Sequence, residues 1–193
     1  TTIFFGALNR QQDWAPIMPT LNRVLKKYGK HIQVVVMLDQ QFFAALQCEQ
    51  KVFYPFCPYP KYQELLQASD IALLPLLPTR FNQMKSDLKF LECAAASTAV
   101  LASPTVYAET VRHGETGLLY ETEEQFRLGL ERLIEDIGFR QRLERNAWEW
   151  VRDNRLLSRH YRERLVWYEQ LFDRYDELTG AIGERVPALR EKN

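Results

Sequence analysis

The chain has 193 residues, of which 46% are hydrophobic and 12% aromatic, and its 25 basic and 25 acidic side chains cancel. This composition supports a folded core and excludes disorder, and the neutral charge gives no reason to expect nucleic acid or an anionic membrane as the main partner. No window approaches the roughly 18 apolar residues of a membrane span, and Thr1 to Arg10 lack the layout of a signal peptide.

Short apolar runs alternate with helical periodicity from the N-terminus onward. We expect strands at Ile3–Gly6, Ile32–Leu38 and Lys51–Tyr54, and helices at Asp13–Tyr28 and Gln41–Gln47. The second strand, IQVVVML, is apolar on both faces, which is typical of an interior strand in a parallel sheet. The segment PFCPYP after the third strand holds three prolines and predicts a loop.

The same alternation continues to Tyr120. We expect helices at Tyr62–Ala68, Ser86–Ala96 and Tyr107–Arg112, and strands at Ile71–Leu76, Ala99–Ser103 and Gly117–Tyr120. Strands separated by single helices require right-handed crossovers, which build a parallel sheet. The predicted fold class is α/β: a Rossmann-like, doubly wound parallel sheet with helices on both faces, plus a C-terminal helical segment.

From Thr122 onward the chain becomes helical and charged. We expect a Rossmann-like domain at 1–155, a long amphipathic helix at 156–180 and a frayed tail at 181–193. The stripe of this helix packs on the domain, on a missing N-terminal domain or on a second subunit, because six large side chains exceed what a soluble monomer normally exposes. The stripe consists of Leu157, Tyr161, Leu165, Tyr168, Phe172 and Tyr175.

The loop after the strand at Ile71–Leu76 carries the strongest signal for a site, because ligands of open parallel sheets bind beyond the carboxyl ends of the strands. Ser86 is a good N-cap residue, which would leave the backbone N–H groups of Asp87, Leu88 and Lys89 without intrahelical acceptors. These donors and the helix dipole favour a phosphate group.

Lys85, Lys89 and Glu92 follow one another at helical spacing, so they share one face of the predicted helix. We expect the opposite face, with Leu88, Leu91 and Ala95, to pack on the sheet. Two ammonium groups suit a diphosphate, and the carboxylate can accept hydrogen bonds from ribose hydroxyls. The alternative is a solvated face on which the two lysines pair with Glu92.

Three motifs occur in order along this part of the chain: Glu92 on the helix, Ala102-Ser103 at the end of a buried strand, and the turn Gly114–Leu119, GETGLL. In this order they resemble the Glu-x7-Glu motif, the Ala-Ser strand end and the Gly-x-Thr-Gly-Leu-Leu turn of GT-B glycosyltransferases of the family 4 (group 1) type. The resemblance spans about Ile3–Glu135. It implies one half of a GT-B fold, the C-terminal nucleotide-sugar-binding domain.

The resemblance implies roles for particular positions. The diphosphate would be held by Arg10, Lys85, Ser86, Asp87, Leu88 and Lys89, and the ribose by Glu92. The nucleobase would lie beside Phe56, Cys57 and Pro58, and the sugar beside Asn82 and Met84. No catalytic residue, metal or other cofactor is implied, because the nucleotide-diphosphate sugar is itself the donor substrate.

The chain also departs from the family pattern. Met84 stands where the first glutamate of the motif falls, eight residues before Glu92, and Gln11–Trp14 stand where a lysine is usual. Asp39-Gln40 replace glycines after the second strand, and Ser97 and Ala99 replace a Gly and a Pro at the helix end. These substitutions indicate a subfamily with altered sugar recognition, or a chain that has lost activity.

The function implied is that of a retaining, hexosyltransferase-like enzyme of polysaccharide or glycoconjugate biosynthesis in the cytoplasm. Its acceptor would be held by a missing N-terminal domain, so the isolated chain would bind donor and transfer nothing; a homo-oligomer is a further possibility. The alternative is a catalytically silent GT-B-like module that binds nucleotide sugar or serves as a scaffold. A GT-B epimerase or phosphorylase lacks its signatures here, and a flavodoxin-like binding domain is the remote alternative.

Other common sites are missing from the sequence. The chain has no Gly-x-Gly-x-x-Gly, no Walker A motif and no Gly-x-Ser-x-Gly, which argues against a dinucleotide enzyme, an NTPase and an α/β-hydrolase. Cys48, Cys57 and Cys93 have no metal-ligand spacing, so we expect free thiols in a reducing compartment.

Overall fold

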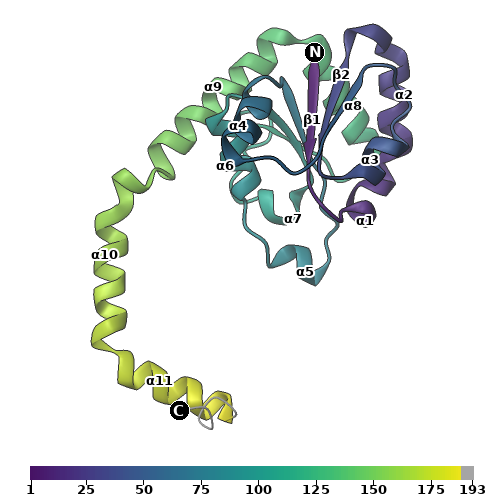
Figure 1. Ribbon diagram of the computed structural model, residues 1–193. Coiled ribbons are helices and arrows are strands. Elements are labelled where there is room, and N and C mark those ends of the chain that lie inside the picture. Colours follow the sequence, from purple (N-terminus) through teal and green to yellow (C-terminus); the bar gives the residue numbers. More distant parts are fainter. Residues whose placement is uncertain (188–193) are drawn as a thin grey trace. The chain divides into compact units, whose positions relative to one another are not determined.

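Six parallel strands form one sheet with the order β3-β2-β1-β4-β5-β6 in this computed structural model, which describes residues 1–187 (Figure 1). The strands are β1 (Thr2–Gly6), β2 (Gln33–Met37), β3 (Lys51–Tyr54), β4 (Ile71–Leu74), β5 (Ala99–Ala102) and β6 (Leu118–Leu119). The chain starts in the middle of the sheet, builds outward through β2 and β3, and returns to the other side of β1 with β4. The strand order therefore reverses between β1 and β4, where open sheets of this kind form their ligand crevice.

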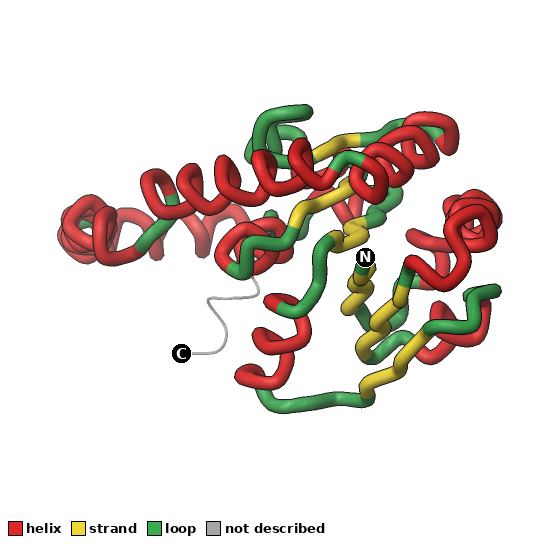
Figure 2. Tube along the Cα trace, turned by 90° about the horizontal axis from the view of Figure 1, so that it is seen from above, coloured by secondary structure: helices red, strands yellow, loops and turns green. Residues whose placement is uncertain are grey.

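Helices cover both faces of the sheet, which confirms the predicted fold class (Figures 1 and 2). In chain order they are α1 (Gln11–Trp14), η1 (Ala15–Ile17), α2 (Met18–Tyr28), η2 (Gly29–His31), α3 (Gln40–Ala45), α4 (Tyr59–Gln67), α5 (Arg80–Gln83), α6 (Leu88–Ala95), α7 (Pro104–Tyr107), α8 (Glu123–Glu135) and α9 (Ile137–Asn154).

Alternating strand residues divide the core into two clusters. Ile3 and Phe5 of β1 pack with residues of α2 and α8 on one face, whereas Phe4 packs with residues of α4 and α6 on the other. Helix α9 joins the two layers, because its N-terminal half contributes to the first cluster and its C-terminal half to the second.

A half-buried ion pair anchors α9 at the amino-terminal edge of the sheet. Arg140 donates to Asp70 Oδ1 at 2.9 Å and to the carbonyl oxygen of Leu133 at 2.9 Å. The other oxygen of Asp70 accepts from the backbone N–H of Thr2 at 2.7 Å. The pair thus connects α9 to β1 and to the start of β4, away from the ligand crevice.

Several predicted helices differ at their ends because of proline. The helix predicted at Asp13–Tyr28 is interrupted by the 3-10 turn η1, which contains Pro16. Helix α4 begins at Tyr59, inside the predicted loop, since Pro60 is tolerated in a first turn. The helix predicted at Tyr107–Arg112 is wrong: α7 ends at Tyr107, and Pro104 is its first residue.

The remaining residues, from Asp153 onward, form a second unit that we describe by itself. The helix predicted at 156–180 is two helices, α10 (Leu157–Asp173) and α11 (Tyr175–Arg185), separated at Arg174. The six side chains of the predicted stripe are all exposed, and α10 has no buried residue. Residues 181–185 of the predicted tail are helical, and 188–193 lie outside the described residues. None of the described helices combines the length and the apolar character that a membrane crossing requires.

Candidate functional site

A cavity of about 310 Å³ lies at the carboxyl edge of the sheet, at the switch point between β1 and β4. The residues after β1 and β4 form its walls, and Lys85, Ser86, Lys89 and Tyr107 complete it. Its charged lining residues are Arg10, Lys85 and Lys89, and no carboxylate among the described residues lines it. Arg10 lies 3.5 Å from Asp13 and Lys89 3.8 Å from Glu92, but neither carboxylate is part of the cavity lining. A lining with three cations and no acid favours an anionic ligand.

Asn82 of α5 brings two of these cations together. Its side-chain oxygen accepts hydrogen bonds from Lys85 Nζ and, at 3.4 Å, from an Arg10 guanidinium nitrogen. Asn82 is only 3% exposed, so its contacts are made behind the cavity wall. The sequence predicted Arg10 and Lys85 as phosphate ligands from separate loops, and the structure places both against one oxygen atom.

Two buried aspartates hold the backbone around this cluster. Asp13 Oδ1 accepts from Asn82 Nδ2 at 2.6 Å and from the backbone N–H of Leu77 at 2.9 Å, which ties the loop after β4 to α1. Asp39 accepts from Trp14 Nε1 at 3.0 Å, and its other oxygen caps α3 through the N–H of Phe42. Neither role could be predicted from the sequence, because a carboxylate that bonds across loops leaves no local pattern.

Helix α6 begins later than predicted. Its first residue is Leu88, and Asp87 is at the N-cap position, so the assignment of Ser86 as N-cap is wrong. The N–H groups of Leu88 and Lys89 have no backbone acceptor among the described residues, whereas those of Phe90 and Leu91 already bond to the Asp87 carbonyl. Two of the predicted backbone donors thus stay open at the start of the helix.

The orientation of α6 also differs from the prediction. Its buried residues are Phe90, Cys93 and Ala94, whereas Leu88 is exposed. Of the stripe predicted to pack on the sheet, Leu91 packs against the core, whereas the prediction is wrong for Leu88 and Ala95, which are exposed. The helix carries two apolar stripes, and only tertiary packing selects between them.

Glu92 lies on α6 beside a second, smaller cavity shared with α4. Tyr62 donates its hydroxyl to Glu92 Oε2 at 2.8 Å, and Lys89 Nζ lies 3.8 Å from the same oxygen and 3.2 Å from the Tyr62 hydroxyl. Burial raises the pKa of Tyr62, so its hydroxyl stays protonated and acts as a donor to the carboxylate. The predicted pairing of Lys89 with Glu92 is present, while Lys85 bonds to Asn82 instead.

The other predicted residues lie outside the anion cavity. Met84 is 76% exposed and Phe56 84% exposed, and Pro58 is exposed as well. Cys57 is half-buried with its Sγ 3.5 Å from Met37 Sδ. Nothing in these contacts shows what the four residues bind, and their sugar-adjacent and base-adjacent roles stay predictions.

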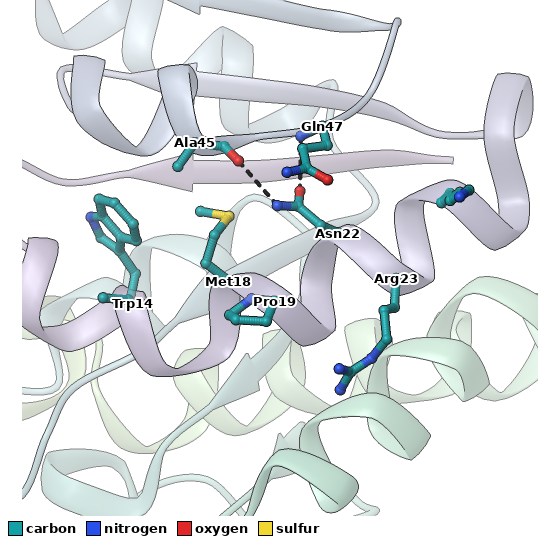
Figure 3. A pocket seen from close by; sticks show the side chains of 9 residues that line it. Trp14, Met18, Pro19, Asn22, Arg23, Ala45 and Gln47 are labelled. Atoms are coloured by element: carbon teal, nitrogen blue, oxygen red, sulfur yellow. Dashed lines mark hydrogen bonds between the residues drawn. The ribbon is translucent and has the colours of Figure 1, made fainter.

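A larger open cavity, about 680 Å³, lies between α2 and the segment after α3 (Figure 3). Its polar centre is already paired, since Asn22 donates to the carbonyl oxygen of Ala45 at 3.0 Å and accepts from the Gln47 N–H at 2.8 Å. Trp14 and Met18 on its wall belong to the core. Its larger volume alone does not make this groove a binding site. The cationic lining favours the cavity at the carboxyl edge of the sheet instead.

The sequence of this chain and its fold both have counterparts among known proteins. Residues 1–136 match the family described as glycosyl transferases group 1. The chain belongs to this family.

Solved structures give the same fold. The C-terminal domain of a group 1 family glycosyl transferase (LpcC) from Francisella tularensis matches with a TM-score of 0.64 and 22% identity, over 79% of this chain and 84% of that one. A glycosyltransferase from Rickettsia africae matches with a TM-score of 0.69 and 17% identity, over 89% of this chain and 48% of that one.

HepE from Anabaena, solved in complex with UDP-glucose, has a TM-score of 0.59 and 17% identity, over 78% of this chain and 43% of that one. The chain therefore spans less than half of the two longer proteins and corresponds to the C-terminal half of a GT-B fold. No curated protein sequence gives a match.

Two departures from the group 1 pattern lie at or beside residues with a left-handed backbone. Leu38, just before Asp39-Gln40, has a φ of 73°, and Ser97 has a φ of 56°. Both are in the left-handed region that glycine adopts without strain, and both stand where the family resemblance leads us to expect a glycine or its neighbour.

Proposed function

We propose that this chain is the donor-binding half of a retaining glycosyltransferase that moves a hexose from a nucleotide-diphosphate sugar to an acceptor. The observation that supports this most directly is the cavity at the switch point, with Arg10, Lys85 and Lys89 on its wall and no carboxylate among the described lining residues. A nucleoside diphosphate is the group of the donor whose charge these three cations would balance.

The cations would also serve the transfer step. As the bond between the sugar and the diphosphate breaks, negative charge grows on the departing diphosphate. Cations and backbone N–H groups that are already oriented stabilise that charge without reorganisation. Because Asn82 and Asp13 fix the positions of Arg10 and Lys85, we propose that the cationic wall supplies this stabilisation and that donor binding needs no metal ion.

The rest of the donor would extend from this cavity. We propose that Glu92, oriented by Tyr62, accepts hydrogen bonds from the ribose hydroxyls, and that the segment Phe56–Pro58 lies beside the base. The sugar would lie toward Met84, where the family has a carboxylate. Asn82 would act from behind the wall, because its amide is committed to protein contacts.

The acceptor would be held by an N-terminal domain of a longer protein. This proposal is supported by the relatives, of which the chain spans 48% and 43%. The exposed aromatic side chains of α10 offer a surface for such a domain or for a second copy of the chain. We place the reaction in the cytoplasm, within polysaccharide or glycoconjugate biosynthesis.

A catalytically silent module is the second candidate, and Met84 in place of the motif glutamate favours it. The two candidates differ in one measurement. The protein with its N-terminal domain hydrolyses or transfers from a nucleotide sugar if it is an enzyme, and only binds it if it is silent. In both cases we expect the 193-residue chain alone to bind donor and to transfer nothing.

The test of donor binding is a thermal-shift and ligand-observed NMR titration of the chain with UDP, GDP, ADP, TDP and CMP. We expect one nucleoside diphosphate to be preferred, and Lys85→Ala to abolish the effect. Lys61→Ala is the matched control, because Lys61 is a lysine on α4 that pairs with Glu64 at 2.6 Å outside the cavity. Loss of binding in both variants, or in neither, would refute the cavity as the diphosphate site.

A further inference from the structure

Tyr107 is a polar residue of the site that no sequence motif singles out. It is the last residue of α7, is 3% exposed, and packs in the same core cluster as Phe90 and Cys93. It also lines the anion cavity, together with Arg10, Lys85 and Lys89.

The hydroxyl of Tyr107 has no hydrogen-bond partner among the described residues. It is nevertheless not one of the buried polar atoms that lack a partner, which are Arg140 Nε and His160 Nε2. Its oxygen is therefore reached by solvent, and Tyr107 is one of the residues that line the anion cavity. A buried tyrosine ring usually finds a partner for its hydroxyl, and a hydroxyl without one in a cavity lined by three cations is available to an anionic ligand.

The chemistry of the surroundings defines that ligand. Burial raises the pKa of Tyr107, against the opposing effect of the Arg10 guanidinium, so the hydroxyl keeps its proton at neutral pH. The charged side chains that line the cavity are lysines and an arginine, which offer no acceptor for that proton. The carboxylates of Asp13 and Asp87 also raise the pKa of Tyr107, but they are not part of the lining. An oxyanion bound in the cavity would accept hydrogen bonds from the three cations and from the Tyr107 hydroxyl.

We propose that the Tyr107 hydroxyl donates a hydrogen bond to a phosphate oxygen of the nucleoside diphosphate held by Arg10, Lys85 and Lys89. The inference rests on the proposed function and adds a neutral donor to the three cations. The ring is fixed in the core, so this donor is in place before the ligand arrives. Tyr107 is a binding residue for the diphosphate rather than part of the packing alone.

Tyr120 provides a matched control. It is 7% exposed, burial raises its pKa as well, and it lines a neighbouring cavity of about 320 Å³. That cavity contains the carboxylates Asp13, Glu121 and Glu123. Tyr120→Phe therefore removes the same hydroxyl from an equally buried ring without touching the anion cavity.

The experiment is a calorimetric titration of the 193-residue chain and its Tyr107→Phe, Tyr120→Phe and Lys85→Ala variants with inorganic pyrophosphate and with UDP. We expect Tyr107→Phe to weaken both ligands by about tenfold or more, since a hydrogen bond to a charged group is lost. Tyr120→Phe should bind like the unaltered chain, and both tyrosine variants should unfold at the same temperature as it does.

The outcomes separate this inference from the proposed function. If Tyr107→Phe binds both ligands normally while Lys85→Ala does not, the role of Tyr107 is wrong and the donor site stands. If Tyr107→Phe weakens UDP but not pyrophosphate, the hydroxyl does not contact phosphate and the inference is again wrong. If the unaltered chain binds neither ligand, both the inference and the proposed function fail.

Discussion

Asn82 and Asp13 are joined by a buried hydrogen bond of 2.6 Å between Asn82 Nδ2 and Asp13 Oδ1, across 69 residues of sequence. The same amide donates to the Leu77 carbonyl at 3.0 Å and accepts from Lys85 and Arg10. The neutral amide of Asn82 thus donates to the buried carboxylate of Asp13 through its nitrogen and accepts from two cations through its oxygen. The arrangement of the anion cavity depends on this pair.

We expect Asn82→Ala to lower the free energy of unfolding by about 2 kcal/mol, because Asp13 and the Leu77 carbonyl lose a buried donor. Binding of the preferred nucleoside diphosphate should also weaken, since Arg10 and Lys85 lose their common acceptor. Urea unfolding and calorimetry measure the two effects. Gln83→Ala is the control on the same short helix, because Gln83 is exposed; equal effects of the two substitutions would contradict the role of Asn82.

Glu92 is expected to recognise the nucleoside and not the phosphates. Glu92→Gln keeps the size of the side chain but removes its charge, so the affinity for the preferred nucleoside diphosphate should fall about tenfold. Pyrophosphate has no ribose, and its affinity should stay the same or rise slightly because a carboxylate near Lys89 is gone. Glu64→Gln on α4 serves as the control. A parallel loss for both ligands would assign Glu92 to the phosphate site and refute the ribose assignment.

Much of this fold follows from short-range sequence patterns, and the site follows only in part. The apolar runs and their alternation with helices were enough to predict all six strands. Lys85 and Lys89 were predicted from their shared helical face and Arg10 from the family resemblance, and all three line one cavity. The start of α6 and its buried face were wrong, since Leu88 and Phe90 lie on alternative apolar stripes. The contacts of Asn82, Asp13 and Tyr107 join distant loops, so no local pattern reveals them.

Ser97 forms the end of α6 in a conformation that suits glycine. The Thr98 N–H bonds to the Cys93 carbonyl at 2.9 Å and the Ser97 N–H to the Ala94 carbonyl at 3.1 Å, the two hydrogen bonds of a Schellman motif with Ser97 in the left-handed position. We expect Ser97→Gly to raise the free energy of unfolding by about 0.5–1 kcal/mol, because relief of strain exceeds the added freedom of the unfolded chain.

Ser97→Ala separates backbone strain from the loss of the hydroxyl. Alanine keeps the Cβ atom and hence the strain, so this variant should show no gain in stability. Urea unfolding compares the free energy of unfolding of Ser97→Gly and Ser97→Ala with that of the unaltered chain. A gain of the same size in the alanine variant would show that the hydroxyl, and not the backbone conformation, costs stability at this position.

Glu144 on α9 predicts a pH dependence of stability. Burial raises its pKa above the ordinary value, although Arg140 Nε at 3.5 Å opposes the shift. Ionised Glu144 is therefore less favourable in the folded chain than in the unfolded chain. The penalty is absent below the unfolded pKa and is complete once the pH exceeds the folded pKa. Glu144→Gln should thus be more stable than the unaltered chain at pH 7, and equally stable near pH 4.

Glu124 gives a control of opposite sign. The hydrogen bond from Arg127 lowers the pKa of Glu124, so its contribution to stability is present above the unfolded pKa and is lost as the pH falls through the folded pKa. Glu124→Gln should therefore lower stability slightly at pH 7 and have no effect in acid. Urea unfolding at several pH values between these limits measures both differences. If Glu144→Gln destabilises at pH 7, its pairing with Arg140 outweighs the cost of burying the carboxylate.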